Sequence, residues 1–241
     1  MCLILGERTI YNHLQIGKGK DIIFLHGWGG NLNSFSSVAN ALSKNYRCTL
    51  IDFYGFGETK HPNHPLSLND YANEVEQIIR YYNMEDVILV GHSFGGRVAI
   101  LIASYSTRIS GILLCDSAGI KPHRTIKYYY KVAKYKLAKS MNMHVQNTGS
   151  SDYNELSGAM RATFVKVVNF NLKPILNKIT VPTLIVWGEL DQETPLYMAH
   201  TLHKYISGSK LNILEGAGHY SYLDCYNQFV GLLKEFLIDY C

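Results

Sequence analysis

Short apolar runs alternate with segments of helical periodicity along most of the chain. The apolar runs end at or near glycine or aspartate and fit buried parallel strands, which are apolar on both faces. They occupy residues 21–27, 47–53, 86–91, 110–116, 181–191 and 210–216. The helical segments occupy residues 34–44, 67–83, 97–106, 195–205 and 226–240. Because such alternation with short connections places parallel strands in one helix-covered sheet, the pattern predicts an α/β fold. Ser67, with Asp70 three residues later, predicts a capping box at the start of one helix.

The alternation stops between residues 120 and 177, where the chain becomes helical, basic and rich in tyrosine. It resumes at residue 181, so the interruption fits an insertion into one sheet better than a second independent domain. We therefore expect residues 1–119 and 178–241 to form one core domain. Residues 120–177 are expected to form a small helical cap inserted into that core. The length of 241 residues suits one large α/β unit.

The composition favours a compact soluble enzyme, because 47% of the residues are apolar and 17% are charged. No apolar run reaches the roughly 18 residues that span a bilayer, so no transmembrane helix is expected. The start of the chain has too short an apolar run and no basic leader for a secretory signal. The five cysteines lack CxxC spacing. Their odd number favours reduced thiols in the cytoplasm over a disulfide framework or a zinc site.

One segment makes the protein basic. The net charge is +4, and the basic segment 121–139 holds seven basic residues and no acidic one. The rest of the chain carries 16 basic and 19 acidic residues. Three lysines at helical spacing form a lysine stripe: Lys127, Lys131 and Lys134. The stripe fits a solvated helix face. It also fits a surface for an acidic carrier protein, an anionic substrate or a membrane. No nucleic-acid motif accompanies the charge.

A glycine-rich stretch, "VGHSFGG" (90–96), joins a predicted strand to a predicted helix. A dinucleotide fingerprint is excluded, because the nearest G-x-G-x-x-G candidate ends at Leu32, and no phosphate-binding P-loop pattern occurs. What remains is G-x-S-x-G around Ser93. Small residues on both sides of a serine permit the sharp strand-to-helix turn that exposes a nucleophile. We therefore expect Ser93 to be a nucleophile and expect no cofactor.

A serine nucleophile needs a base, and the base needs an orienting carboxylate. In folds with this turn, the partners follow in the order Ser, Asp, His at the ends of later strands. Asp191 follows the strand of 181–191, and His219 follows the strand of 210–216. Asp116 ends an earlier strand and is a competing acid, but the motif position favours Asp191.

The loop after the first strand of the alternation, "HGWGGN" (26–31), is expected to help bind the oxyanion. Its glycines leave backbone N–H groups free to face a ligand, and the amides of Trp28 and Phe94 are the expected donors. His26 and His92 flank these two turns and are expected to be structural. Asp52 is expected to stabilise a turn.

Together these motifs resemble the α/β-hydrolase superfamily. The series is "HGWGG" (26–30), "DFYGFGET" (52–59), "GHSFGG" (91–96), "WGELD" (187–191) and "GAGH" (216–219). It spans nearly the whole chain outside 120–177. The first and third motifs look most like the carboxylesterase and carrier-protein methyl-ester esterase branch. Tyr54 departs from the arginine or proline that many members carry in the "D-x-x-G-x-G" turn.

The resemblance implies a mostly parallel eight-stranded sheet flanked by helices, a first strand pair near residues 3–17, and a helical cap over the site. It carries Ser93, Asp191 and His219 over as a catalytic triad, and a serine nucleophile argues against dehalogenase or epoxide hydrolase chemistry. The expected function is a serine hydrolase that cleaves small carboxylic esters through an acyl-enzyme, with no cofactor and no metal. The alternative is a non-hydrolytic protein of this fold, such as a ligand receptor, a lyase or a perhydrolase.

Overall fold

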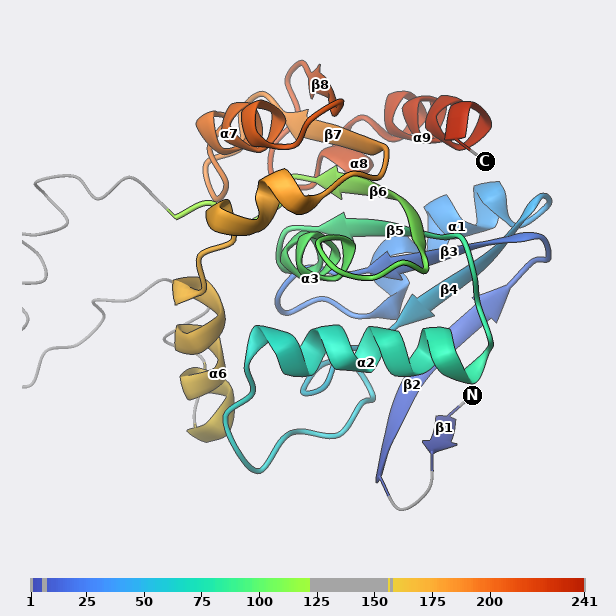
Figure 1. Ribbon diagram of the computed structural model, residues 1–241, viewed down its shortest axis with the longest axis vertical. Coiled ribbons are helices and arrows are strands. Elements are labelled where there is room, and N and C mark those ends of the chain that lie inside the picture. Colours follow the sequence, from blue (N-terminus) through green and yellow to red (C-terminus); the bar gives the residue numbers. More distant parts are fainter. Residues whose placement is uncertain (1, 6–7, 122–155, 157, 241) are drawn as a thin grey trace, which may run out of the picture.

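The computed structural model describes residues 2–5, 8–121, 156 and 158–240. Within them, eight strands form the sheet seen in Figure 1. The strands are β1 (Cys2–Leu5), β2 (Arg8–Ile16), β3 (Lys20–Leu25), β4 (Tyr46–Ile51), β5 (Val87–His92), β6 (Ile109–Cys115), β7 (Thr183–Gly188) and β8 (Lys210–Leu214). Their order is β1-β2-β4-β3-β5-β6-β7-β8. Strand β1 lies at the edge of the sheet and is antiparallel to β2, and β2 is antiparallel to β4. All other neighbours are parallel.

Helices cover both faces of the sheet (Figure 1). They are η1 (Leu32–Phe35), α1 (Ser36–Leu42), α2 (Leu68–Tyr81), α3 (Phe94–Ala103), α6 (Gly158–Asn169), η2 (Lys173–Lys178), α7 (Tyr197–Tyr205), α8 (Ser221–Asp224) and α9 (Tyr226–Tyr240). One apolar core joins the sheet to α2, α3 and α7. A second core joins it to α1, α8 and α9.

Strand β3 shows why the central strands are apolar throughout. Ile23 and Leu25 pack in the core beneath α2, α3 and α7. Ile22 and Phe24 point to the opposite face and pack against α1 and α9. All four side chains are buried. Because both faces are covered, each position along the strand is apolar.

The predicted α/β fold is therefore confirmed, with its mostly parallel eight-stranded sheet and flanking helices. Helix α9 has the predicted bounds, and the predicted strand pair near the start of the chain is β1 with β2. The capping box is confirmed: the Ser67 hydroxyl accepts a hydrogen bond from the Asp70 amide, and the Asp70 carboxylate accepts one from the Ser67 amide. Helix α3 begins three residues earlier than predicted, because Gly95 and Gly96 belong to its first turn.

The segment between β6 and β7 contains α6 and η2 among its described residues. Helix α6 is tied to the segment before α2, because the Thr163 hydroxyl accepts a hydrogen bond of 2.9 Å from the Leu66 amide. The basic segment lies outside the described residues except for Lys121. The division into a core and a cap at 120–177 stays a prediction.

The strand order reverses direction beside β3, since β4 lies on one side of β3 and β5 on the other. In open α/β sheets, ligands bind outside the carboxyl ends of the strands at such a switch point. The loop containing Trp28 follows β3, and Ser93 follows β5. These two candidate residues therefore lie at the edge where a ligand site is expected.

Among the helices of the described residues, none is long and apolar enough to cross a membrane.

Candidate active site

Ser93 occupies a strained turn between β5 and α3. Its backbone has φ 48° and ψ −110°, a conformation that non-glycine residues rarely adopt. A Cβ on Gly91 would lie 2.6 Å from the Gly95 carbonyl oxygen, and a Cβ on Gly95 would collide with the carbonyl of Leu25. The turn is held in place because the Ser93 amide donates to the Cys115 carbonyl (3.1 Å). The G-x-S-x-G pattern thus follows from the tight contact of this turn with its neighbours.

His219 and Asp191 form a hydrogen-bonded pair. The Nδ1 of His219 lies 2.9 Å from Oδ2 of Asp191. Oδ1 of Asp191 accepts the backbone amides of Glu193 (2.8 Å) and Thr194 (3.0 Å), and Oδ2 also accepts the Thr194 hydroxyl (2.6 Å). Because Asp191 only accepts these bonds, it fixes the proton of the imidazole on Nδ1 and leaves Nε2 as the basic nitrogen.

The pair shifts both pKa values. Burial alone would raise the pKa of Asp191, but the hydrogen bonds from His219 and Thr194 outweigh it and lower the pKa. Burial alone would lower the pKa of His219, but Asp191 raises it above the ordinary value, with a smaller contribution from Glu193. The carboxylate therefore stays charged while the imidazole binds a proton more readily than in water.

Glu193 is a neighbour that sequence reasoning missed. Its Oε2 lies 3.4 Å from Nε2 of His219, on the nitrogen that Asp191 leaves free. Its side chain is 65% exposed, so it can change conformation at little cost. The only feature of the sequence that could have indicated a contact between Glu193 and His219 is that Glu193 follows Asp191 by two residues.

Asp116, the competing acid, has different partners. Its Oδ1 accepts the Gly188 amide (2.7 Å). Its Oδ2 accepts both the amide (3.1 Å) and the hydroxyl (2.6 Å) of Ser221. Asp116 is fully buried, and burial raises its pKa to about 6. It joins the end of β7 to the loop after His219, whereas Asp191 is the carboxylate hydrogen-bonded to the imidazole.

The loop after β3 is held by polar contacts at its base. His26 is buried, its Nε2 accepts the Phe53 amide (3.2 Å), and its Nδ1 then donates to the Gly27 carbonyl (2.7 Å). Burial lowers the pKa of His26 to about 4, so the ring is neutral at pH 7. Asp52 accepts the Leu32 amide (2.6 Å) in the same loop. Both residues therefore hold the loop.

His92 is likewise buried beside the turn that contains Ser93. Its Nε2 lies 2.8 Å from the carbonyl oxygen of His219, to which it donates. Burial lowers its pKa to about 3, so it is neutral and serves to position the loop that carries His219.

The two amides expected to bind an oxyanion belong to Phe94, which follows Ser93 in the chain, and to Trp28, which lines both cavities together with Ser93. Phe94 is the first residue of α3, so its N–H has no partner within the helix. The Trp28 amide donates to no other backbone group in the part of the chain that the structure describes. The Trp28 ring packs against Phe56, Phe94 and Phe164 at centroid distances of 4.9 to 5.3 Å.

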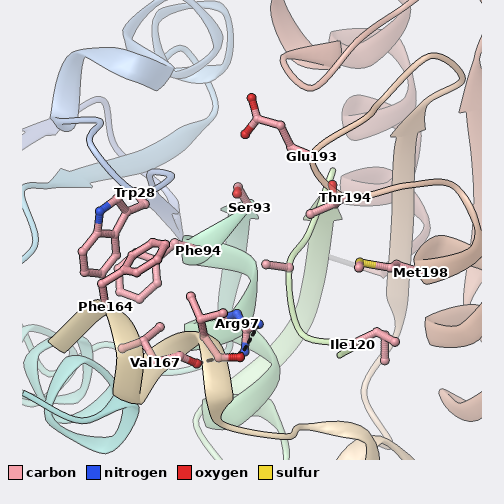
Figure 2. A pocket seen from close by; sticks show the side chains of 12 residues that line it. Trp28, Ser93, Phe94, Arg97, Ile120, Phe164, Val167, Glu193, Thr194 and Met198 are labelled. Atoms are coloured by element: carbon pink, nitrogen blue, oxygen red, sulfur yellow. Dashed lines mark hydrogen bonds between the residues drawn. The ribbon is translucent and has the colours of Figure 1, made fainter. Parts of the chain in front are cut away.

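Two cavities open beside Ser93. The first has a volume of about 170 Å³, and Figure 2 shows its lining. Its residues are Trp28, Ser93, Phe94, Arg97, Ala118, Ile120, Phe164, Val167, Val168, Glu193, Thr194 and Met198. The second has a volume of about 290 Å³ and is lined by Gly27, Trp28, Gly29, Gly30, Ser34, His92, Ser93, Glu193, His219, Tyr220 and Tyr222. The structure therefore brings Ser93, His219 and Trp28 together around one space. Within the described ranges, no group of three His, Cys, Asp or Glu side chains could hold a metal ion.

Comparison with known proteins places the chain in a family. A family model described as alpha/beta hydrolase fold matches residues 21–169, and one described as TAP-like protein matches residues 167–239. The first match covers more than half of the chain, so the protein belongs to the α/β hydrolase fold family. The resemblance inferred from the motifs is confirmed.

Individual relatives are more distant. The pimeloyl-[acyl-carrier protein] methyl ester esterase of Aeromonas hydrophila is 27% identical over an alignment of 256 positions, which covers 92% of this chain and 97% of the relative. The 2-hydroxy-6-oxo-6-(2'-aminophenyl)hexa-2,4-dienoic acid hydrolase of Metapseudomonas resinovorans is 24% identical over an alignment of 260 positions, which covers 96% of this chain and 88% of the relative. The esterase structure from Exiguobacterium antarcticum superposes with a TM-score of 0.77 at 24% identity and covers 95% of each chain, which shows a shared fold. The family and its hydrolase relatives support hydrolase activity for this protein.

Proposed function

We propose that this protein is a serine hydrolase that cleaves carboxylic esters through an acyl-enzyme intermediate. The observation that carries the proposal is the arrangement around the second cavity. A serine in a strained, glycine-flanked turn shares this cavity with an imidazole, and a buried carboxylate holds the Nδ1 of that imidazole. Those are the groups that nucleophilic attack by a hydroxyl requires.

In the first half of the reaction, the Ser93 oxygen attacks the ester carbonyl and Nε2 of His219 takes the hydroxyl proton. The protonated imidazole then gives that proton to the departing alkoxide, which leaves as an alcohol. Asp191 stabilises the imidazolium through its 2.9 Å hydrogen bond. Glu193 occupies Nε2 in this structure, so its exposed side chain turns away before Ser93 engages the imidazole.

In the second half, His219 takes a proton from water, and the resulting hydroxide attacks the acyl carbon. The bond from that carbon to the Ser93 oxygen then breaks, and Ser93 recovers its proton from the imidazolium. The carbonyl oxygen carries negative charge in both halves. Amide donors such as those of Trp28 and Phe94 stabilise that charge, and loss of one such donor costs about 10²–10³ in kcat.

The ester substrate and a carrier remain parts of this proposal. The relative from Aeromonas hydrophila is named for a methyl ester on an acyl-carrier protein, which supports an ester substrate and an acidic carrier for this chain. The basic segment would attract such a carrier.

The free thiols of Cys48, Cys115 and Cys225 agree with the cytoplasmic location expected from the sequence, which stays a prediction.

A fluorophosphonate probe tests the nucleophile. Labelling followed by peptide mapping should place one adduct on Ser93, and Ser93→Ala should abolish it. Ser34→Ala is the matched control, because Ser34 is a second serine in the same cavity and should not affect labelling. An adduct on another serine would refute the assignment. Labelling without turnover of any ester would favour a non-hydrolytic member of the fold.

A further inference from the structure

The two cavities beside Ser93 differ in their relation to His219. His219 lines the second cavity and is absent from the lining of the first. Under the proposed function, the protonated imidazole must reach the oxygen of the leaving group. The alcohol part of the ester therefore occupies the second cavity, and the acyl part extends into the first.

The first cavity combines an apolar wall with one buried positive charge. In Figure 2, Ser93 stands at the tip of α3 and Arg97 lies further along the same helix. Arg97 follows Ser93 by four residues, so it lies about 6 Å further along the helix axis. Apolar side chains surround the space between them, including Phe164, Val167 and Met198. Arg97 is only 5% exposed.

Backbone carbonyls near the end of α6 take up part of the hydrogen-bonding capacity of Arg97. Its Nη1 donates to the carbonyls of Val167 (3.2 Å) and Phe170 (3.0 Å), and its Nη2 donates to that of Val168 (3.5 Å). A guanidinium has five N–H donors. The Nε donor and one Nη2 donor have no hydrogen-bond partner among the described residues. A guanidinium with two donors to spare can bind a carboxylate through both of its oxygens.

The charge of Arg97 is not cancelled by a carboxylate in the described part of the chain, where its bonds go to carbonyl groups. Burial lowers its pKa to about 10, which still leaves the side chain protonated at pH 7. A buried charge without a counter-ion is costly, because carbonyl dipoles compensate it only partly. An anionic ligand in the first cavity would provide the missing compensation.

We propose that the first cavity binds an acyl group that ends in a carboxylate, with Arg97 as the residue that recognises this distal carboxylate. The substrate class is the half-ester of a short dicarboxylic acid. Hydrolysis would break the single ester bond next to Ser93 and release an alcohol and the dicarboxylate. This inference rests on the proposed function and narrows it.

A matched pair of substrates tests the inference on the wild-type protein. Monomethyl glutarate and methyl glutaramate have the same leaving group and nearly the same shape, but only the first carries a distal carboxylate. The half-ester should have a kcat/KM at least about tenfold above that of the amide, mainly through a lower KM, because bonds between charged groups are stronger than neutral ones. Salt removes any steering of the half-ester by the lysine stripe, but a preference for the half-ester should remain in high salt, since a buried ion pair is screened much less than a surface one. Equal or better turnover of the amide would overturn the proposal.

Substitutions identify the residue responsible. Arg97→Met should bring the ratio of the two kcat/KM values to about one, and Arg97→Lys should retain part of the preference, because it keeps the charge but not the planar fork. Lys166→Met is the control: Lys166 is an exposed lysine of α6 that donates to the Pro65 carbonyl and does not line the cavity. It should leave the ratio unchanged. A folded Arg97→Met protein that keeps the wild-type ratio would contradict the assignment to Arg97.

Failure of the two proposals can be told apart. If neither ester is hydrolysed and Ser93 is not labelled by a fluorophosphonate, the serine hydrolase proposal fails. If Ser93 is labelled and both esters are hydrolysed at equal rates, only the anionic acyl group is excluded. Because Arg97 also contacts α6, the folding of each variant is checked by circular dichroism. If Arg97→Met does not fold, the ratio of kcat/KM for the half-ester and the amide ester in the wild-type protein decides whether the first cavity prefers an anionic acyl group.

Discussion

The two buried carboxylates near His219 allow a comparison of matched substitutions, Asp191→Asn and Asp116→Asn. In Asp191, Oδ1 accepts two backbone amides, while Oδ2 faces Nδ1 of His219 and the Thr194 hydroxyl. The amide oxygen of asparagine must keep the position of Oδ1, because backbone N–H groups cannot face an NH₂ group. The NH₂ group is then placed against the imidazole. It donates to Nδ1 and moves the imidazole proton to Nε2, where the ring can no longer accept a proton from Ser93.

The expected loss in kcat for Asp191→Asn is about 10³–10⁴-fold. At 1.36 kcal/mol for each factor of ten, this equals about 4–5.5 kcal/mol of transition-state stabilisation. Asp116 contacts the Gly188 and Ser221 groups and not the imidazole, so Asp116→Asn should change kcat by less than about tenfold.

Steady-state hydrolysis of a p-nitrophenyl ester measures both variants, with circular dichroism as the check on folding. The rate of fluorophosphonate labelling should fall with kcat in Asp191→Asn. A larger loss in Asp116→Asn than in Asp191→Asn would refute the reasoning and assign the acid to the end of β6.

Three further predictions concern stability and charge. The folded-state pKa of Asp116 is about 6 against an ordinary value of 3.8, so its ionisation opposes folding as the pH rises from about 4 to 7. Urea titration measures the free energy of unfolding of the wild type and of Asp116→Asn at each pH. The value for the wild type should fall relative to the variant by up to about 3 kcal/mol as the pH rises through this window. A difference that does not change with pH would exclude the raised pKa of Asp116. Gly95→Ala should prevent the turn that contains Ser93 and lower the Tm markedly, whereas Gly231→Ala, in α9 with nothing within 4 Å of the added Cβ, should be neutral or stabilising. Equal Tm values for the two variants would contradict the packing of the turn. If the lysine stripe steers anionic substrates, replacing it by glutamine should lower kcat/KM for anionic but not neutral esters. Added salt should do the same, because charges are screened beyond about 8 Å at physiological ionic strength. No loss on either kind of ester would assign the stripe to a solvated helix face. Equal losses on both kinds of ester would point to folding of the cap.

The secondary structure was largely predictable because local patterns determine it. Apolar runs on both faces of a sheet give strands, and the last helix follows its 226–240 periodicity without a break. The start of α3 was not predictable from the sequence. Gly95 and Gly96 are weak helix formers, and they are needed here for close contact with β3 and Ser117. The short elements η1 and α8 have four residues each, too few to show a period.

The site was predictable as a set of positions and not as a set of contacts. Motif order indicated Ser93, Asp191 and His219, whose catalytic roles stay predictions. The contact between Glu193 and Nε2 depends on side-chain direction, which spacing does not determine. Arg97 was visible as the one charge in the apolar helical segment 97–106, but its place in a cavity beside Ser93 depends on the packing of α6.

The most direct measurement of the central claim is the mass of the protein during turnover. Rapid acid quenching of the enzyme with an excess of ester, followed by intact mass spectrometry and peptide mapping, should show a population heavier by one acyl group, with that group on Ser93. His219→Ala should strongly reduce the accumulation of this species. Ester hydrolysis by folded protein without an acyl adduct, or with the adduct on another residue, would contradict the acyl-enzyme mechanism at Ser93.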